Sequence, residues 1–338
     1  MTRVAVIGAG GWGTALSIAA ARAGREVRLW SQNAAVAEEV NSRRVNSAYL
    51  TGHAVPEAVR ATSDAREALT GAGLVILAAP SHATRAVLES LRGEFETDAV
   101  LVSATKGVEV ETGLRISEVV GEVLGGRAAS RFVCLSGPSF AQEVAAGQPT
   151  AVVAASGDEA LAREVQQALS AANFRVYTNP DVVGTELGGA SKNVMALAAG
   201  MVAGLGLGTN SVAALVTRGL AEMTRLALAE GGRSETLMGL AGLGDLVLTC
   251  TGGLSRNRRV GEELGRGRAL EDVLAGMREV AEGVRTASAV RLLAARRGVE
   301  MPITCEVHAV LYDGKPARAA VESLMARPLK DEFEIGGR

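Results

Sequence analysis

The sequence contains few of the residues that build disulfide frameworks and zinc sites. Among 338 residues there are three cysteines and three histidines. Cys134, Cys250 and Cys305 lie far apart and form no CxxC pair, which argues against a disulfide framework and against a structural zinc site. The histidines also lack the spacing of metal ligands. We therefore expect a protein that works without a metal.

The sequence also lacks strong net charge and long hydrophobic runs. The formal net charge is −2, which supplies no general attraction to nucleic acid or to an anionic membrane. The wholly apolar run 194–208 is shorter than the ~20 residues needed to span a bilayer, so it predicts a buried helix. The strand-like run Arg3–Gly8 leaves no room for a signal peptide. We expect a soluble cytoplasmic protein with neither a membrane span nor a nucleic-acid partner.

Glycine is abundant, and the chain is long. There are 41 glycines, against roughly 24 at average usage of about 7%. They follow no G-X-Y period, so they serve local backbone geometry instead of a collagen helix. The 338 residues exceed what one hydrophobic core usually serves and predict two domains of roughly 150 residues each.

The first half of the chain alternates β-rich runs with helical patterns. This alternation predicts an α/β domain with a doubly wound parallel sheet, because several runs are continuously apolar, as in strands covered on both faces. The expected strands are Arg3–Gly8, Glu26–Trp30, Leu74–Ala79, Val100–Ser103, Phe132–Ser136, Thr150–Ala155 and Phe174–Thr178. The expected helices between them are Trp12–Ala23, Ser81–Leu91, Arg115–Val123 and Asp158–Ala171.

From Val182 onward the pattern is almost entirely helical. Ala- and Leu-rich stretches are separated by glycine-containing breaks, which predicts an all-α second domain. We place the boundary at 180, giving domains 1–180 and 181–338. The expected helices are Gly184–Ala203, Ser211–Glu230, Glu235–Met238, Arg256–Gly265, Ala269–Ala275, Val284–Arg297, Ile303–Tyr312 and Pro316–Ala326.

A glycine motif follows the first strand and begins the first helix. Gly8-Ala9-Gly10-Gly11-Trp12-Gly13 matches G-x-G-x-x-G in the strand–turn–helix context that the motif requires. Gly8 permits a tight turn, Gly10 lets the backbone approach a pyrophosphate, and Gly13 allows close packing of helix on strand. Phosphates would lie at the helix N-terminus, where unpaired N–H groups and the helix dipole favour anions. The motif predicts a dinucleotide site.

The end of the second strand bears on the choice of nicotinamide cofactor. It reads Trp30-Ser31-Gln32-Asn33 and lacks the carboxylate that binds a ribose 2′-hydroxyl and repels a 2′-phosphate. Two interpretations of the nearby Arg43 and Arg44 stay open. They would help to accommodate a 2′-phosphate, or they belong to a solvated helix face.

Polar residues in otherwise apolar surroundings mark further candidate positions. Arginines in a first helical turn oppose the helix dipole, which favours a bound anion there. Strand ends in a doubly wound sheet are where ligands bind. The clusters are Ser103–Gly107 and Leu135–Phe140 at strand ends, Gly188–Asn193 in the most apolar helix, the Gly-rich turn Gly242–Leu246, the helix start Leu254–Arg259, and the pair Glu282–Gly283 just before a helix.

Lys192 is the most informative of these residues. A lysine among Val, Met, Ala and Leu side chains loses hydration, which favours the neutral amine and lowers its pKa. Such an amine can act as a general base on an alcohol or as a general acid to a forming alkoxide. The alternative is a lysine whose ammonium reaches water along its aliphatic stem. Composition alone does not choose between the two.

Six segments together resemble the bacterial type of NAD(P)-dependent glycerol-3-phosphate dehydrogenase, in order and spacing over roughly residues 4 to 320. They are Gly8–Gly13, Ser103–Glu109, Gly137–Glu143, Gly188–Asn193, Gly242–Cys250 and Ser255–Gly261. The resemblance implies a Rossmann-type domain plus a helical domain. It also implies interconversion of sn-glycerol 3-phosphate and dihydroxyacetone phosphate with NAD or NADP, supplying glycerol 3-phosphate for phospholipid synthesis. A homodimer and the absence of a metal are further expectations.

The resemblance also implies roles for individual residues. The catalytic lysine is Lys192, with Lys106 and Asp245 beside it. Substrate contacts are implied for Lys106, Gly137, Ser139, Lys192, Asp245, Ser255, Arg256 and Asn257. Cofactor contacts are implied for Gly8, Gly10, Gly11, Trp12, Gly13, Gln32, Asn33, Tyr49, Lys106, Ala141, Arg256, Val280 and Glu282.

Two departures and two alternatives remain. The family often has Arg or His where this chain has Gln32 and Asn33, and Tyr-Leu-Pro-Gly where this chain has Tyr49-Leu50-Thr51-Gly52. The first departure leaves a preference for NADP open. A 3-hydroxyacid or ketopantoate-type reductase would also use an arginine, for a carboxylate substrate. A non-catalytic NAD(P)-sensing module is the other alternative, although the presence of both lysines and Asp245 argues against it.

Overall fold

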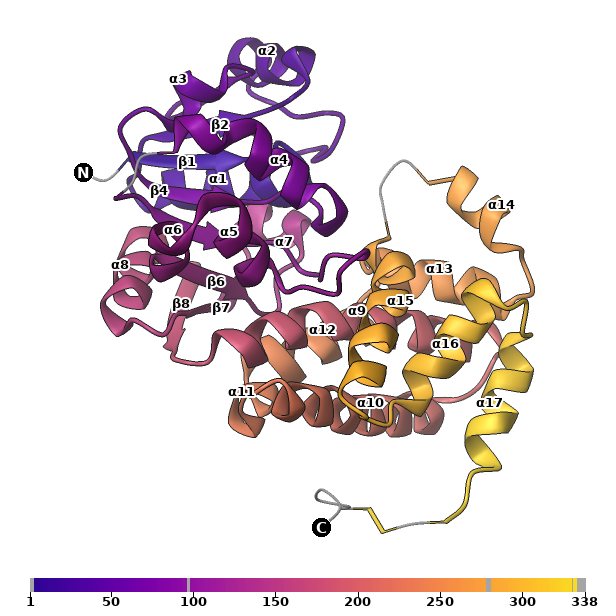
Figure 1. Cartoon of the computed structure of the whole chain (residues 1–338). Coiled ribbons are helices and arrows are strands. Elements are labelled where there is room, and N and C mark those ends of the chain that lie inside the picture. Colours follow the sequence, from indigo (N-terminus) through magenta and orange to yellow (C-terminus); the bar gives the residue numbers. More distant parts are fainter. Residues whose placement is uncertain (1–2, 96–97, 278–280, 330, 333–338) are drawn as a thin grey trace.

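The computed structural model describes residues 3–95, 98–277, 281–329 and 331–332. In this part of the chain an eight-stranded sheet has the order β3-β2-β1-β4-β5-β6-β7-β8 (Figure 1). The strands are β1 (Arg3–Ile7), β2 (Val27–Trp30), β3 (Val59–Thr62), β4 (Ala72–Leu77), β5 (Val100–Ser103), β6 (Phe132–Ser136), β7 (Thr150–Ala155) and β8 (Phe174–Asn179). The edge strand β3 was not predicted, because its four residues are too few to show a strand pattern.

The sheet is mixed, so the expectation of an all-parallel sheet was wrong for its last part. Strands β1 to β6 run parallel, β7 pairs antiparallel with β6, and β8 follows β7 in parallel. A buried run such as Thr150–Ala155 shows that a strand is covered on both faces, but not in which direction it runs. The carboxyl ends of β1, β4, β5 and β6 consequently meet at one edge of the sheet.

Helices cover both faces of the sheet. Alternating residues of β1 point to opposite sides: Val4 and Val6 belong to one buried cluster, Ala5 and Ile7 to another. The helices of this part are α1 (Gly11–Arg22), α2 (Ala34–Arg43), α3 (Ala65–Leu69), α4 (Thr84–Leu91), α5 (Ile116–Leu124), α6 (Gly126–Ser130), α7 (Ala141–Ala146) and α8 (Glu159–Leu169). The α/β prediction for this half is confirmed.

Beyond residue 180 the described chain is helical. Its central element is α9 (Val182–Gly204), which is capped by the Asp181 side chain and buried almost throughout. Around it pack α10 (Thr209–Ala229), α12 (Asp245–Thr251), α13 (Arg256–Gly265) and α15 (Glu282–Arg296). The remaining elements are α11 (Ser234–Met238), the π-helical turn η3 (Leu240–Gly244), α14 (Leu270–Ala275), α16 (Pro302–Tyr312) and α17 (Ala317–Met325). None of the described helices combines the length and the hydropathy needed to cross a membrane.

The change of element type between Asn179 and Val182 agrees with the division that we propose, residues 1–180 and 181–338. One segment of the first part crosses that division. Val108, between β5 and α5, is fully buried in the hydrophobic core of the helical part. This crossing brings the sheet edge and the helical part together at one site.

Candidate active site

The glycine-rich turn has the geometry that the motif predicts. Gly8 adopts a φ of +112°, which favours glycine. A Cβ at Gly13 would lie 1.9 Å from the carbonyl oxygen of Gly8, so helix α1 can pack on β1 only with glycine there. Around Gly10 a Cβ would meet nothing within 4 Å. The N-terminus of α1 therefore packs closely on the end of β1 through Gly13. It is open at Gly10, where the motif predicts a pyrophosphate.

Two residues implied to contact the cofactor, Tyr49 and Ala141, lie beside this turn. A Cβ at Gly11 would be 2.7 Å from the carbonyl oxygen of Tyr49 and 3.9 Å from the Cβ of Ala141. The indole N–H of Trp12 donates to the carbonyl oxygen of Ala104 at 3.2 Å. The structure thus brings these residues, far apart in sequence, to one place.

The end of β2 carries no carboxylate directed at a ribose. Gln32 is exposed, and the side-chain oxygen of Asn33 accepts from the backbone N–H of Ala35 as the cap of α2. Glu39, in α2, accepts from the N–H and the hydroxyl of Ser47, at 3.0 and 2.7 Å. That carboxylate is therefore bound to Ser47.

The two arginines at the end of α2 have different surroundings. Arg44 has a φ of +56° and donates to the backbone carbonyls of Val55 and Val59. Its guanidinium is bound to the loop, which argues against a contact between Arg44 and a 2′-phosphate. Arg43 has a side chain 74% exposed and lies 3.5 Å from Glu39, which fits the alternative of a solvated helix face.

At the centre of the site one carboxylate binds two lysines. Asp245 is fully buried. Its Oδ1 accepts from the Lys192 ammonium, and its Oδ2 accepts from Lys106 Nζ at 2.9 Å. Lys192 is 5% exposed, so the alternative in which its ammonium reaches water was wrong. Burial is the main cause that lowers the pKa of Lys192 to about 8, with Asp245 opposing and Lys106 adding to the effect.

Thr249, which was not predicted from the sequence, also binds Lys192. Lys192 Nζ donates to Thr249 Oγ1 at 3.0 Å, and this hydroxyl donates to the Asp245 carbonyl at 2.6 Å. Thr249 is the polar residue four positions after Asp245 in an apolar stretch, so helical spacing was the available signal. The expected Gly-rich turn is in fact η3 leading into α12, and a π-helical turn of this kind often marks a functional site.

Lys106 links this centre to the sheet edge. Its Nζ donates to the Gly137 carbonyl at 2.7 Å and to Ser139 Oγ at 3.2 Å, both beyond β6. It also lies 5.8 Å from the centroid of the Trp12 ring. Lys106 therefore lies close both to Trp12 of the glycine-rich turn and to Asp245.

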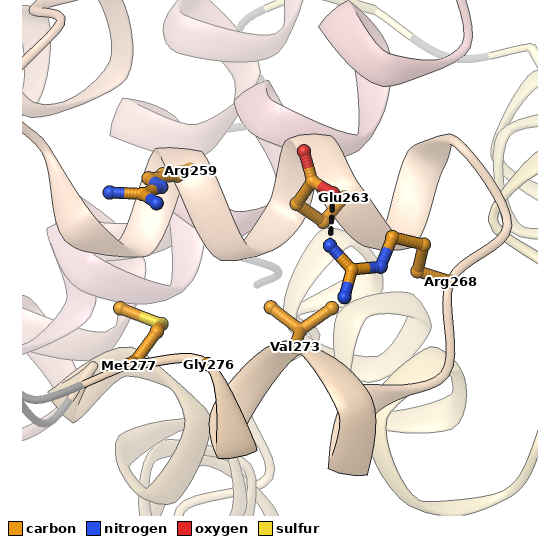
Figure 2. Close-up of a pocket in the computed structure, with 6 residues that line it drawn as sticks. All are labelled: Arg259, Glu263, Arg268, Val273, Gly276 and Met277. Carbon is orange, nitrogen blue, oxygen red and sulfur yellow. Dashed lines mark hydrogen bonds and ion pairs between the residues drawn. The ribbon is translucent and has the colours of Figure 1, made fainter.

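The start of α13 is capped as predicted, but its three arginines diverge. Ser255 Oγ accepts from the backbone N–H of Arg258. Arg258 lies 3.8 Å from Glu262. Arg259 lines a separate pocket of about 140 Å³ between α13 and α14, where Figure 2 shows Arg268 paired with Glu263. Arg256 instead lies close enough to Glu282 to lower the pKa of that carboxyl, although burial raises it overall.

Both polar atoms of the Asn257 side chain are hydrogen-bonded within the protein. It is 8% exposed, its amide nitrogen donates to Asn193 Oδ1 at 3.0 Å, and its Oδ1 accepts from Gly283 N at 2.9 Å. A contact to a substrate phosphate would come from its backbone N–H, because first-turn N–H groups lack an intrahelical partner.

Glu282 is the first residue of α15, not a residue before the helix. Its carboxylate accepts from the backbone N–H of Ser81 at 3.1 Å, beyond β4. This bond joins the helical part to the sheet edge where the cofactor is expected. Val280, the other implied contact here, lies outside the described residues. Within those residues no cluster of three or more His, Cys, Asp or Glu side chains could hold a metal ion.

Family models and known proteins match this chain over almost its whole length. The family model for the NAD-dependent glycerol-3-phosphate dehydrogenase N-terminus matches residues 3–162, and the model for the C-terminus matches residues 181–322. The Koribacter versatilis glycerol-3-phosphate dehydrogenase (NAD(P)+) is 56% identical over 98% of this chain and 99% of its own. The protein of that name from Geobacter sulfurreducens is 54% identical over 98% of both chains.

Solved structures agree as well. The crystal structure of glycerol-3-phosphate dehydrogenase from Coxiella burnetii is 40% identical, with a TM-score of 0.91 over 96% of this chain and 99% of that one. A ketopantoate reductase from Ralstonia eutropha, at 17% identity and a TM-score of 0.58, shares only the fold. The chain belongs to the NAD-dependent glycerol-3-phosphate dehydrogenase family.

Proposed function

We propose that this protein interconverts sn-glycerol 3-phosphate and dihydroxyacetone phosphate with NAD or NADP, and so supplies glycerol 3-phosphate for phospholipid synthesis. The observation that supports this proposal most strongly is the position of Lys192 and Lys106 on the buried carboxylate of Asp245. It lies between the glycine-rich turn, which Lys106 approaches through Trp12, and the helix that begins with Arg256. Relatives that match the full chain carry this activity in their names.

The residues around the glycine-rich turn fit a dinucleotide. The open backbone at Gly10 and the N-terminus of α1 suit a pyrophosphate, and the Cβ-free faces of Gly11 and Gly13 leave room for close backbone packing. Trp12, Tyr49 and Ala141 surround the same turn. When bound, a nicotinamide cofactor supplies the acceptor or donor for the hydride at C2 of the substrate.

Lys192 is the residue that we assign to proton transfer. In oxidation, its neutral amine takes the proton of the C2 hydroxyl. In reduction, its ammonium gives that proton to the developing alkoxide. A pKa of about 8 places both protonation states within reach near neutral pH. Asp245 and Thr249 hold the amine in place.

The remaining polar residues are assigned to binding. Lys106, whose ammonium also binds the Gly137 carbonyl and Ser139, is positioned to polarise the C2 oxygen. The phosphate would be bound at the start of α13 by Arg256, Ser255 and first-turn N–H groups, because charge-assisted donors at a helix N-terminus bind phosphate well. Gln32, Asn33 and Glu282 would contact the cofactor.

A homodimer, a cytoplasmic location and metal-free catalysis remain predictions. The alternative of a 3-hydroxyacid or ketopantoate-type reductase is weakened by sequence identity, since the ketopantoate reductase shares only 17%. The alternative of a non-catalytic sensor is weakened by the two lysines on the buried carboxylate of Asp245, which cofactor binding alone would not need.

The test is the oxidation of NADH and of NADPH, followed spectrophotometrically with several acceptors. We expect turnover with dihydroxyacetone phosphate and at least about a hundredfold lower kcat/KM with unphosphorylated dihydroxyacetone, because the phosphate contacts are charge-assisted. Ketopantoate and other 2-keto acids are the controls. Turnover confined to 2-keto acids would support the alternative reductase, and no turnover with any acceptor would support the sensor.

A further inference from the structure

Lys106 stands on a segment that leaves the sheet and enters the helical part. Figure 1 shows the purple chain between β5 and α5 extending from the sheet towards α15. Val108, two residues after Lys106, is fully buried in the core of the helical part, in the same cluster as Leu187 and Val284. The position of the Lys106 ammonium therefore depends on what holds this segment at both ends.

Glu109 makes several of the hydrogen bonds that hold this segment in place. It is 6% exposed, and its two carboxylate oxygens accept from Arg85 Nε at 2.7 Å and Arg85 Nη2 at 2.9 Å. Thr112 Oγ1 donates to the same carboxylate at 2.5 Å. A two-point guanidinium pair fixes orientation as well as distance. Arg85 belongs to α4, so Glu109 fastens the segment to the sheet domain.

The backbone of Glu109 is hydrogen-bonded to the other end of the same segment, at Gly113 and Leu114. Its N–H donates to the Leu114 carbonyl at 2.9 Å, and its carbonyl accepts from Gly113 N at 2.8 Å. On the helical side, Arg296 donates to the Thr112 carbonyl at 2.7 Å, and the Asn193 amide donates to the Lys106 carbonyl at 3.2 Å. Residues 106–114 thus form a closed loop clamped between α4 and helices α9 and α15.

We propose that Glu109 is a positioning residue for Lys106: through Arg85 and Thr112 it holds loop 106–114 so that the Lys106 ammonium reaches Asp245 and the substrate oxygen. This inference rests on the proposed function for the role of Lys106. Glu109 belongs neither to the glycine motif nor to α13, where the phosphate is expected. Its carboxylate binds Arg85 and Thr112 and neither of the two lysines. Its effect on the reaction passes through loop geometry.

The test compares two variants that each remove one carboxylate from Arg85. Glu109→Gln removes the partner on the loop. Glu122→Gln removes the other partner, which lies in α5, 2.7 Å from Arg85 Nη2 and outside the loop. We expect Glu109→Gln to lower kcat about tenfold or more, because small displacements of a reacting group are costly. Glu122→Gln should keep the wild-type kcat.

The pH dependence of kcat separates positioning from a merely structural role. The charged and titratable groups facing Lys192 are Asp245 and Cys250 from α12, Lys106 from the loop, and Glu282 from α15. If Lys106 moves away, Lys192 loses a like charge, and its pKa rises. The limb of the oxidation profile near pH 8 should therefore move up by about half a pH unit in Glu109→Gln. It should stay in place in Glu122→Gln.

Trp12 gives a second measurement that needs no turnover. Its ring lies 5.8 Å from Lys106 Nζ, so displacement of that ammonium should change its emission. In a Trp30→Phe background, Glu109→Gln should change the Trp12 emission maximum and Glu122→Gln should not. If Glu109→Gln does not fold, Thr112→Val, which removes only one bond to the carboxylate, should give smaller changes in the same directions.

Several results would overturn the proposal. One is an unchanged kcat in Glu109→Gln. Another is a lowered kcat with the pH limb and the Trp12 emission both unmoved, which would leave Glu109 a purely structural residue. Absence of turnover in the wild-type protein would instead refute the proposed function, and the Trp12 emission would still report whether Glu109 places Lys106.

Discussion

Lys106 and Lys192 bind the two oxygens of one buried carboxylate, Asp245, from different parts of the fold. Lys106 reaches it from a loop beyond β5, and Lys192 from the middle of α9. The carboxylate keeps both ammonium groups in a site almost without solvent, since buried charges need partners. Because Asp245 and Lys106 both act on Lys192, changing either of them should shift the pKa of Lys192.

Replacing Lys192 should abolish most turnover without affecting cofactor binding. In Lys192→Met we expect kcat to fall by at least about 10², the usual contribution of proton transfer by a positioned group. NADH binding, measured by fluorescence titration, should be unchanged. Lys315→Met is the control, since Lys315 pairs with Glu306 in a different region. Turnover close to wild type in Lys192→Met would remove this lysine from the mechanism.

The pH profile of oxidation should report the amine of Lys192. Because the neutral form is the base, the rate of glycerol 3-phosphate oxidation should rise with pH through about 8, and the reverse reaction should decline above it. The residual activity of Asp245→Asn should show this limb at lower pH, since an attractive charge is lost. Lys106→Met should show it at higher pH, since a repulsive charge is lost. Shifts of the same sign in both variants would contradict the arrangement.

The sequence predicted the local features of this site better than its connections. The glycine turn, the Ser255 cap and the buried helix around Lys192 each follow from residues close together in the chain. The shared carboxylate of Asp245 and the hydroxyl of Thr249 depend on how α12 packs against α9, which spacing alone does not fix. The direction of β7 was likewise hidden, because a strand buried on both faces reads the same in either direction.

The phosphate site should depend on Arg256 and not on its neighbour Arg259. Arg256→Ala should weaken the use of dihydroxyacetone phosphate by roughly 1.5–3 kcal/mol, the range for hydrogen bonds to charged groups. That is a loss of about ten- to 150-fold in kcat/KM. Arg259→Ala is a matched control from the same helical turn, because Arg259 lines the separate pocket of Figure 2. An unchanged KM in Arg256→Ala would place the phosphate elsewhere.

Both nicotinamide cofactors should be used, with less than about a hundredfold discrimination, because no carboxylate at the end of β2 repels a 2′-phosphate. With Arg44 committed to the loop, the exposed Arg43 is the remaining candidate partner. Arg43→Ala should therefore change the NADPH/NADH ratio of kcat/KM by about fivefold at most. Gln32→Asp should favour NADH strongly. A wild-type preference for NADH beyond a hundredfold would show that this account of β2 is wrong.

Stability should depend on pH through Glu222, far from the lysines. Glu222, in α10, is 2% exposed and accepts from the backbone N–H groups of Ile303 and Thr304 at 2.6 and 3.2 Å, at the start of α16. Burial is the main cause that raises its pKa to about 7, from an ordinary value of 4.5. The folded protein therefore holds this proton more tightly than the unfolded chain does. The resulting stabilisation is complete below about pH 4.5 and is lost as pH rises through about 7.

Glu222→Gln keeps the shape of the side chain but removes this titration. Between pH 5.5 and 8, the free energy of unfolding of the wild-type protein should fall relative to the variant by about 2 kcal/mol, since one pKa unit corresponds to about 1.4 kcal/mol. Urea midpoints of both proteins at the two pH values measure the difference. Glu263→Gln, at a half-buried position in α13 where arginine contacts lower the carboxyl pKa, is the control and should follow the wild-type pH dependence. Parallel curves for wild type and Glu222→Gln would mean that Glu222 stays ionised throughout, held by the N-terminus of α16.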